Sequence, residues 1–209
     1  MVQSLNTAAI RSAWAVVRRP ALLAPHAAVA DIREIPFERL RRAGIRHIVF
    51  DKDNCLTAPY VDSIHPPFAD AWQRCRAAFP GDGVLIVSNS AGTGDDAGGR
   101  AADAVERALG VPVLRHREKK PRCGREILAR LAAADPAEIA VVGDRLATDV
   151  ALANLNGMAA IWTRQIVSSK GDNRAAAALR RLEHAAHDCA QHARDVRALL
   201  SVGPGLWPA

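Results

Sequence analysis

The chain has 209 residues, of which 49% are hydrophobic and 24% are charged, and its formal net charge is +6. This length fits one domain whose core can form without disulfide or metal crosslinks, and no apolar run is long enough to span a membrane. The four cysteines form no C-x-x-C pair, which excludes the common zinc and thioredoxin-like patterns. A basic balance favours phosphorylated substrates, nucleic acid or anionic lipid surfaces as partners, without choosing among them.

The first 30 residues are taken as an N-terminal segment that precedes a domain over residues 31–209. They contain no Asp or Glu but include Arg11, Arg18 and Arg19. Apolar residues recur there at helical spacing among Ser and Thr hydroxyls. This pattern favours an organelle-targeting segment or an amphipathic stretch at a membrane interface. An ordinary surface helix packed on the domain is the alternative.

Five short runs of apolar and β-branched residues predict strands. Several are nearly continuous in apolar character, which suits parallel strands covered on both faces. The runs are Ile45–Phe50, Val84–Ser88, Val111–Leu114, Ile139–Val142 and Ala159–Trp162.

Four apolar stripes with helical spacing lie between or beside these runs and predict helices. Pro80-Gly81, Gly110 and Asn156-Gly157 end three of them. Strands alternating with helices predict a parallel sheet with right-handed crossovers, that is, a doubly wound α/β fold. The stripes cover residues 68–79, 101–109, 127–131 and 150–155, and a longer helix is expected over about 173–200.

Polar and charged residues follow the predicted strands, where ligands bind in open α/β sheets. Carboxylates gathered at one edge would repel one another unless a cation were bound, and oxygen ligands without His or Cys favour Mg²⁺. Carboxylates, Mg²⁺ and a lysine together are typical of phosphoryl transfer, in which a carboxylate can attack phosphorus. The residues concerned are Asp51, Asp53, Ser88, Asn89, Asp144 and the pair Lys119-Lys120.

These residues resemble, in order, the four motifs of the haloacid dehalogenase superfamily. The segment 51–57 (DKDNCLT) resembles its D-x-D-x-[TV] motif, with additional spacing before the threonine. Lys120 is preferred to Lys119 for the third motif because it directly precedes Pro121. Ser88 matches the hydroxyl of the second motif, and Gly143-Asp144 with Asp149 matches the fourth. The resemblance implies the doubly wound, HAD-like fold of that superfamily.

Longer strings resemble one family, the mitochondrial-type phosphatidylglycerophosphatases. They are PHAAVADIREI (25–35), FDKDNCLTAPY (50–60), SNSAGT (88–93), KKPRC (119–123) and VVGDRLATDV (141–150). The family dephosphorylates phosphatidylglycerophosphate to phosphatidylglycerol, in the pathway to cardiolipin. The resemblance therefore implies a phospholipid substrate, peripheral contact with an anionic membrane surface, and no nucleic-acid partner. It also implies a place on the mitochondrial inner membrane, with a plastid as the alternative.

The resemblance also implies a role for each matched residue. Asp51 would attack the phosphorus in line and form an aspartyl phosphate, while Asp53 would protonate the leaving glycerol oxygen and then activate water. Ser88 would hydrogen-bond a phosphoryl oxygen, and Lys120 would neutralise charge on the phosphoryl group and Asp51. The expected Mg²⁺ ligands are Asp51, the Asp53 main-chain carbonyl, Asp144 and, directly or through water, Asp149. The residues expected to bind substrate are Asn89, Lys119 and Arg145.

Two of these expectations have alternatives. Asp149 could instead cap the following helix or support Asp144, and Asn89 could simply shape its turn. A basic rim for a second phosphate is expected from Arg115, His116, Arg117, Lys119 and Arg145, although a solvated basic surface would have the same composition.

The stretches 57–88 and 90–119 each hold a loop, one helix and one strand. Neither leaves room for the cap domain that many members of the superfamily insert there, so we expect an open, capless site that suits a bulky substrate at a surface. Two other functions stay open: a capless phosphatase of nucleotides, nucleic-acid ends or phosphoproteins, and a non-catalytic lipid- or nucleic-acid-binding module. The intact motifs disfavour the module, and the longer strings favour the phospholipid.

Overall fold

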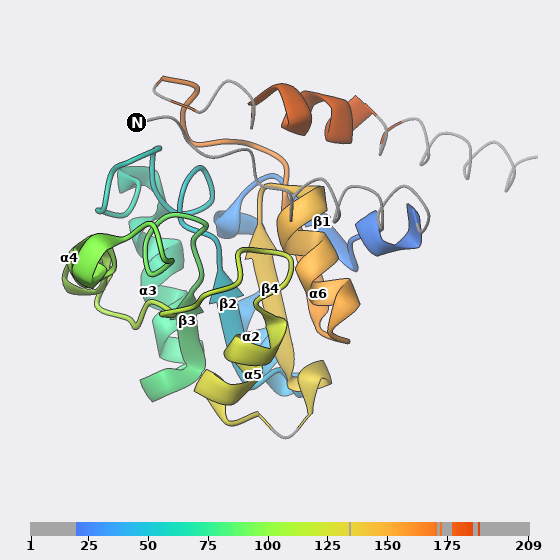
Figure 1. Cartoon of the computed structure of the whole chain (residues 1–209). Coiled ribbons are helices and arrows are strands. Elements are labelled where there is room, and N and C mark those ends of the chain that lie inside the picture. Colours follow the sequence, from blue (N-terminus) through green and yellow to red (C-terminus); the bar gives the residue numbers. More distant parts are fainter. Residues whose placement is uncertain (1–19, 134, 171, 173–176, 186–187, 189–209) are drawn as a thin grey trace, which may run out of the picture. The chain divides into compact units, whose positions relative to one another are not determined.

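The computed structural model describes residues 20–133, 135–170, 172, 177–185 and 188 (Figure 1). The chain divides into one unit over residues 1–172 and a second over residues 173–209. In the second unit residues 177–185 are helical, within the long helix predicted there. The remainder of that prediction, and residues 1–19 of the N-terminal segment, lie outside the described residues.

A five-stranded sheet forms the centre of the first unit, and every strand pair in it is parallel. The strand order is β1-β5-β4-β2-β3, so the chain reverses its direction of travel across the sheet between β3 and β4. This confirms the predicted α/β fold with a parallel sheet. The strands are β1 (Ala27–Val29), β2 (His47–Phe50), β3 (Val84–Ile86), β4 (Ile139–Gly143) and β5 (Ala159–Thr163).

Helices cover both faces of this sheet (Figure 1). Alternate residues of β2 separate the two layers, because Ile48 and Phe50 pack with α2, α3 and α4, whereas Val49 packs with α5 and α6. The doubly wound arrangement follows from this alternation. The helices are α2 (Phe37–Arg42), α3 (Ala69–Ala78), α4 (Arg100–Leu109), α5 (Gly124–Leu131) and α6 (Ala151–Leu155). Short 3₁₀ turns are η1 (Pro20–Leu23), η2 (Ile32–Glu34), η3 (Pro66–Phe68), η4 (Gly81–Gly83), η5 (Ala97–Gly99) and η6 (Pro136–Glu138), and η7 (Leu146–Val150) is a π-helical turn.

The predicted strand Val111–Leu114 is wrong as a strand. It lies beside β3, but Val113 makes only an isolated bridge to Ile86, with one hydrogen bond from Ile86 N to Pro112 O and another from Leu114 N to Ile86 O. Pro112 has no N–H to donate, which limits the ladder at this edge of the sheet.

The remaining strand of the sheet, β1, was not predicted, because three residues are too few to show a period. It pairs with β5, so the sheet includes residues that sequence analysis placed in the N-terminal segment. The expected boundary at residue 30 itself stays a prediction. The short helix α2 was also missed.

The absence of room for a cap is confirmed in the described stretches 57–88 and 90–119. The first holds η3, α3, η4 and β3, and the second holds η5, α4 and the bridged segment. The edge of the sheet where the parallel strands end is therefore bordered by loops and not by an inserted domain.

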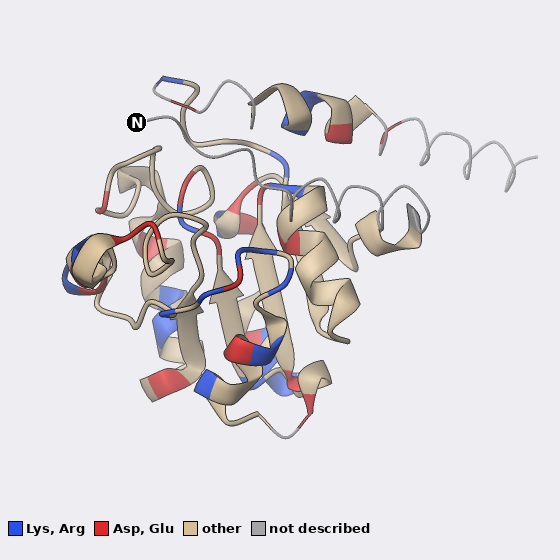
Figure 2. Ribbon diagram, viewed as in Figure 1, with Lys and Arg blue, Asp and Glu red and all other residues tan. Residues whose placement is uncertain are grey.

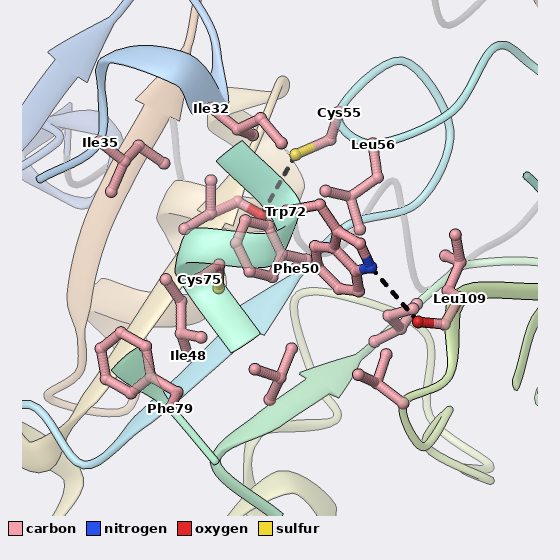
Figure 3. Packing of buried hydrophobic residues seen from close by; sticks show 14 of the residues in the cluster. Ile32, Ile35, Ile48, Phe50, Cys55, Leu56, Trp72, Cys75, Phe79 and Leu109 are labelled. Atoms are coloured by element: carbon pink, nitrogen blue, oxygen red, sulfur yellow. Dashed lines mark hydrogen bonds between the residues drawn. The ribbon is translucent and has the colours of Figure 1, made fainter. Parts of the chain in front are cut away.

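Trp72 on α3 contacts both β2 and α4 in the core (Figure 3). Its ring meets Phe50 edge-on, with the ring centroids 5.7 Å apart, and its indole N–H donates to the carbonyl of Leu109 at 3.3 Å. Cys55 is buried nearby, and its Sγ lies 3.8 Å from the Val142 carbonyl oxygen. Burial raises the pKa of this thiol well above its ordinary value, which disfavours the reactive thiolate, and Cys55 packs in the core.

Replacing Trp72 tests this packing. We expect Trp72→Ala to lower the free energy of unfolding by about 3–5 kcal/mol, because it leaves a large cavity and an unsatisfied carbonyl. Urea unfolding measures the loss. Leu155→Ala, at an exposed side chain on α6, is the control and should change stability by less than about 0.5 kcal/mol. Equal losses in the two variants would contradict the assignment.

Candidate active site

The register of β2 and β4 brings the first and fourth motifs together. Phe50 pairs with Val142, and the next residue, Asp51, donates its N–H to the Val142 carbonyl at 2.9 Å. Asp144 follows the last residue of β4, and its carbonyl accepts the indole N–H of Trp162 at 3.0 Å. Both aspartates thus leave neighbouring strands at the same edge of the sheet.

Asp149 completes an acidic cluster with Asp51 and Asp144. One carboxylate oxygen from each of the three lies within 4.8 Å of the others. Asp149 comes from η7, where its Oδ2 accepts the N–H of Arg145 at 3.2 Å and the hydroxyl of Thr148 at 3.3 Å. Asp149 therefore shapes the turn after β4 and also lies in the cluster. Its expected roles, as metal ligand, helix cap or support for Asp144, stay predictions.

Gly143 is what lets Asp149 come so close to the end of β4. A Cβ built on Gly143 would lie 2.3 Å from the Asp149 carboxyl carbon, a distance at which atoms overlap. The Gly-Asp pair of the fourth motif thus has a steric reason, since any side chain at residue 143 would push Asp149 out of place.

Lys120 pairs with two carboxylates of this cluster. Its Nζ lies 2.7 Å from Asp51 Oδ1 and 2.7 Å from Asp149 Oδ1, and its side chain is only 2% exposed. Burial disfavours the ammonium, but the carboxylates of Asp149 and Asp51 outweigh it and raise the pKa of Lys120 above its ordinary value. Burial also raises the pKa of Asp149, against the effect of Lys120. We take Lys120 and Asp149 as ionised, because the Lys120 ammonium contacts the carboxylates of both Asp51 and Asp149.

Lys119 has a different setting from its neighbour. Its Nζ pairs with Asp95 at 2.5 Å, and the Asp95 side chain is largely exposed. The preference for Lys120 over Lys119 in the third motif agrees with this geometry. Binding of substrate by Lys119 stays a prediction.

The two other residues expected to bind substrate have contacts within the protein. Asn89 Oδ1 accepts the main-chain N–H of Lys120 at 2.8 Å, so Asn89 anchors the segment that carries the lysine. Arg145 is half-buried beside Asp149. Their roles toward a substrate are not decided by these contacts and stay predictions.

Asp53 is set apart from the acidic cluster. Its Oδ1 accepts the Tyr60 N–H at 3.0 Å and lies 2.8 Å from Nζ of Lys52, whose side chain is nearly buried. Lys52 also donates to the Val61 carbonyl at 3.0 Å. Sequence analysis assigned no role to Lys52. Its position between two aspartates of the first motif could have indicated that it contacts one of them.

Ser88 follows β3 and is buried. Its Oγ lies 3.0 Å from Ser90 Oγ and accepts the Ser90 N–H at 3.2 Å. The strand ends thus bring Asp51, Asp144 and the segment of Ser88 to one edge, as predicted.

The expected basic rim is only partly present. Figure 2 shows blue segments, interrupted by red and tan, along the connection before α5. Arg115 is nevertheless paired with Glu106 at 2.9 Å and Asp103 at 2.6 Å, and His116 is buried, which removes it from any rim. Alternation along an extended segment turns neighbouring side chains to opposite sides, and sequence alone did not show which side faced inward.

The acidic cluster fits a hard divalent cation. Lys120 pairs with two of the three carboxylates, the third lies within 4.8 Å of them, and every donor atom of the cluster is a carboxylate oxygen. Such a donor set suits Mg²⁺ better than a soft metal. Three carboxylates beside a buried ammonium at one open edge form an arrangement that is suited to phosphoryl transfer.

The adjacent lysines allow a matched test of the buried cluster. We expect Lys120→Met to lower the free energy of unfolding by roughly 3–5 kcal/mol in metal-free buffer, because it leaves two carboxylates without their partner. Lys119→Met breaks an exposed pair and should cost about 0–1 kcal/mol. Chemical unfolding of both variants measures the difference, and similar small losses would show that the Lys120 pairs do not stabilise the site.

Comparisons with known proteins show which family this chain is similar to. Residues 7–168 match the model of the family described as mitochondrial PGP phosphatase. The chain is 36% identical over 164 residues to phosphatidylglycerophosphatase GEP4, mitochondrial, of Saccharomyces cerevisiae, covering 77% of this chain and 88% of the relative. It is 40% identical over 158 residues to phosphatidylglycerophosphate phosphatase 1, chloroplastic/mitochondrial, of Arabidopsis thaliana, covering 75% of this chain and 45% of the relative.

A third relative is phosphatidylglycerophosphate phosphatase 1, chloroplastic, of Chlamydomonas reinhardtii, which is 41% identical over 150 residues. The match covers 71% of this chain and 55% of that relative, so the chain spans about half the length of the plant and algal proteins. The family match takes in all four motifs and the whole sheet. The chain belongs to the mitochondrial PGP phosphatase family.

Proposed function

We propose that this chain hydrolyses phosphatidylglycerophosphate to phosphatidylglycerol and phosphate, with Mg²⁺ and through an aspartyl phosphate on Asp51. The observation that carries the proposal is the buried contact of Lys120 with Asp51 and Asp149, beside Asp144. Family membership supports the substrate, since the relatives are named for this reaction.

In the first half-reaction, a carboxylate oxygen of Asp51 forms a bond to phosphorus while the bond from phosphorus to the glycerol oxygen breaks. Lys120 holds Asp51 from one side through Oδ1, which orients the carboxylate for attack. The departing oxygen takes a proton from Asp53. To reach it, Asp53 gives up its contacts with Lys52 and the Tyr60 N–H.

In the second half-reaction, Asp53 removes a proton from water. The water oxygen then bonds to phosphorus, and the bond from phosphorus to the Asp51 oxygen breaks, which returns Asp51 as a carboxylate and releases phosphate. Lys120 and the Ser88 hydroxyl stabilise the negative charge on the phosphoryl oxygens in both steps.

The metal would be held by Asp51, Asp144 and the main-chain carbonyl of Asp53, with Asp149 acting directly or through water. When bound, Mg²⁺ neutralises negative charge on the phosphoryl group and on the carboxylates around it. We include the cation because three carboxylates gather where a negatively charged phosphoryl group would bind.

Replacing the nucleophile gives the direct test. We expect Asp51→Asn to lower turnover by at least about a thousandfold without unfolding the protein, because the amide keeps the shape but cannot form the aspartyl phosphate. Phosphate release from phosphatidylglycerophosphate in detergent micelles measures it, with Mg²⁺ and with EDTA. Activity of Asp51→Asn near that of the wild type would contradict the covalent mechanism.

The same assay separates the substrates. A soluble panel of nucleotides and glycerol phosphate is run beside the lipid. Mg²⁺-dependent release from the lipid alone supports the proposal, whereas release from the soluble panel alone keeps the mechanism and overturns the substrate.

We also propose that the loop after the first motif meets the lipid surface. Tyr60 is 68% exposed and Val61 is 42% exposed, and both lie in the loop whose main chain contacts Asp53 and Lys52. An exposed tyrosine beside an apolar residue suits the boundary between headgroups and acyl chains. None of the helices in the described part of the chain has the length and apolar character to cross a bilayer. From this exposed loop and the relatives named mitochondrial or chloroplastic, we propose peripheral attachment to the mitochondrial inner membrane, with a plastid membrane as the alternative.

Charge placed on this loop tests the attachment. We expect Tyr60→Asp with Val61→Asp to lower hydrolysis of vesicle-borne phosphatidylglycerophosphate at least about tenfold, because each side chain loses about 1.5–3 kcal/mol of apolar transfer energy. Hydrolysis of soluble p-nitrophenyl phosphate should stay unchanged. Leu155→Asp, another exposed apolar position, is the control. An equal loss on both substrates would point to damage at Asp53 instead of lost membrane contact.

A further inference from the structure

The loop over residues 58–62 is tied to the proposed general acid, Asp53, by one buried ammonium. The side chain of Lys52 is only 4% exposed, and its Nζ lies 2.8 Å from Asp53 Oδ1 and donates to the Val61 carbonyl at 3.0 Å. The same Nζ lies 3.7 Å from Asp62 Oδ1. The loop thus supplies two of these three oxygen atoms, and Asp53 supplies the third.

The carboxylate of Asp53 is held by the loop as well. Its Oδ1 accepts the Tyr60 N–H at 3.0 Å, beside the contact with Lys52. Both of these donors belong to the loop or are bound to it. A displacement of the loop therefore draws the Tyr60 N–H and the Lys52 ammonium away together, which leaves the Asp53 carboxylate able to turn.

The segments on either side of the loop are fixed by main-chain hydrogen bonds. The Lys52 carbonyl accepts the N–H groups of Leu56 and Thr57 at 2.9 and 3.1 Å. The Leu56 carbonyl accepts the His65 N–H at 2.9 Å, and Leu56 itself is fully buried. The residues between Thr57 and His65 can therefore shift while the base of the loop stays in place.

Tyr60 has a strained main chain. Its φ is +61°, in the left-handed region that a bulky side chain seldom adopts. The N–H of Tyr60 is held in this conformation by Asp53. Strain of this kind persists only while the surrounding contacts impose it, so loss of the Asp53 contact lets Tyr60 relax.

We propose that Lys52 is a positioning residue that couples contact with a lipid surface to the position of Asp53. Away from lipid, Lys52 holds Asp53 against the loop, as in this structure. When Tyr60 and Val61 enter the lipid, the favourable transfer of their side chains shifts the loop. The ammonium then follows the Val61 carbonyl, and Asp53 is released toward the phosphoryl group. The inference rests on the proposed function and deepens it, since hydrolysis becomes faster at a membrane surface than in solution.

Tyr60 is the only tyrosine of the chain, so ¹⁵N-tyrosine labelling of the full-length protein gives its amide NMR signal without further assignment. The probe is small bicelles of phosphatidylcholine with phosphatidylglycerol, without substrate. We expect the bicelles to shift the Tyr60 amide proton upfield, because its N–H loses the carboxylate acceptor. Lys52→Met should shift the signal in the same direction without lipid. Lys170→Met removes the same charge from an exposed lysine and should act like the wild type.

The wild-type response decides the coupling even if Lys52→Met fails to fold, which circular dichroism shows. An unchanged Tyr60 signal in protein that sediments with vesicles of the same lipids would overturn the coupling. Failure to bind the vesicles would overturn both the lipid contact of the loop and the coupling. Equal responses of the two lysine variants would remove the role of Lys52.

Kinetics test the consequence for hydrolysis. Glycerol phosphate is soluble and keeps the alkyl oxygen that takes its proton from Asp53. We expect substrate-free vesicles of the same lipids to raise its hydrolysis by the wild type at least about tenfold, and by Lys52→Met less than about twofold. A wild-type rate that ignores the vesicles would contradict the coupling. Where glycerol phosphate is not hydrolysed, the NMR result alone decides the coupling, and a protein that is also inactive on the lipid refutes the proposed function.

Discussion

The ion pairs of Lys120 with Asp51 and Asp149 are the interaction on which the site depends. An ammonium and carboxylates this deeply buried are costly to remove from water, and only mutual contact at close range offsets that cost. The three residues come from different places: the end of β2, the turn η7 after β4, and the connection before α5. The contact between these three residues therefore forms only when the sheet and the segments around it are folded.

Several features of the fold serve this contact. Parallel pairing of β2 and β4 ends both strands at one level, Gly143 leaves room for Asp149, and Asn89 holds the main chain of Lys120. His116 and Gly92 bind the same connection to the loop after β3. Hydrogen bonds thus fix the main chain on the lysine side of the site, whereas Asp53 sits in a loop with the exposed Tyr60 and Val61. In the proposed mechanism Asp53 exchanges its partners.

The openness of this edge has a functional consequence. Many enzymes close a cap over a small substrate to exclude water, but here the stretches where a cap could be inserted contain only elements of the core fold. In the proposed attachment, the loop of Tyr60 and Val61 rests on the membrane, and the lipid takes the place of a cap by excluding water from one side of the site. In such a site the bilayer presents the substrate, so that few protein groups are needed to bind it.

Sequence by itself determined the α/β class, four of the five strands, and the position of Asp51, Ser88 and Asp144 at the strand ends, because buried parallel strands leave apolar runs and these residues follow them. Tertiary structure alone decided the rest. β1 is too short to show periodicity, and Val111–Leu114 fails as a strand because Pro112 lacks a donor for its ladder. The inward turn of His116, the pairing of Lys119 with Asp95 and the contact of Lys52 with Asp53 depend on which residues distant in sequence face one another. Burial and charge pairing are properties of that arrangement in space, and local sequence patterns do not encode them.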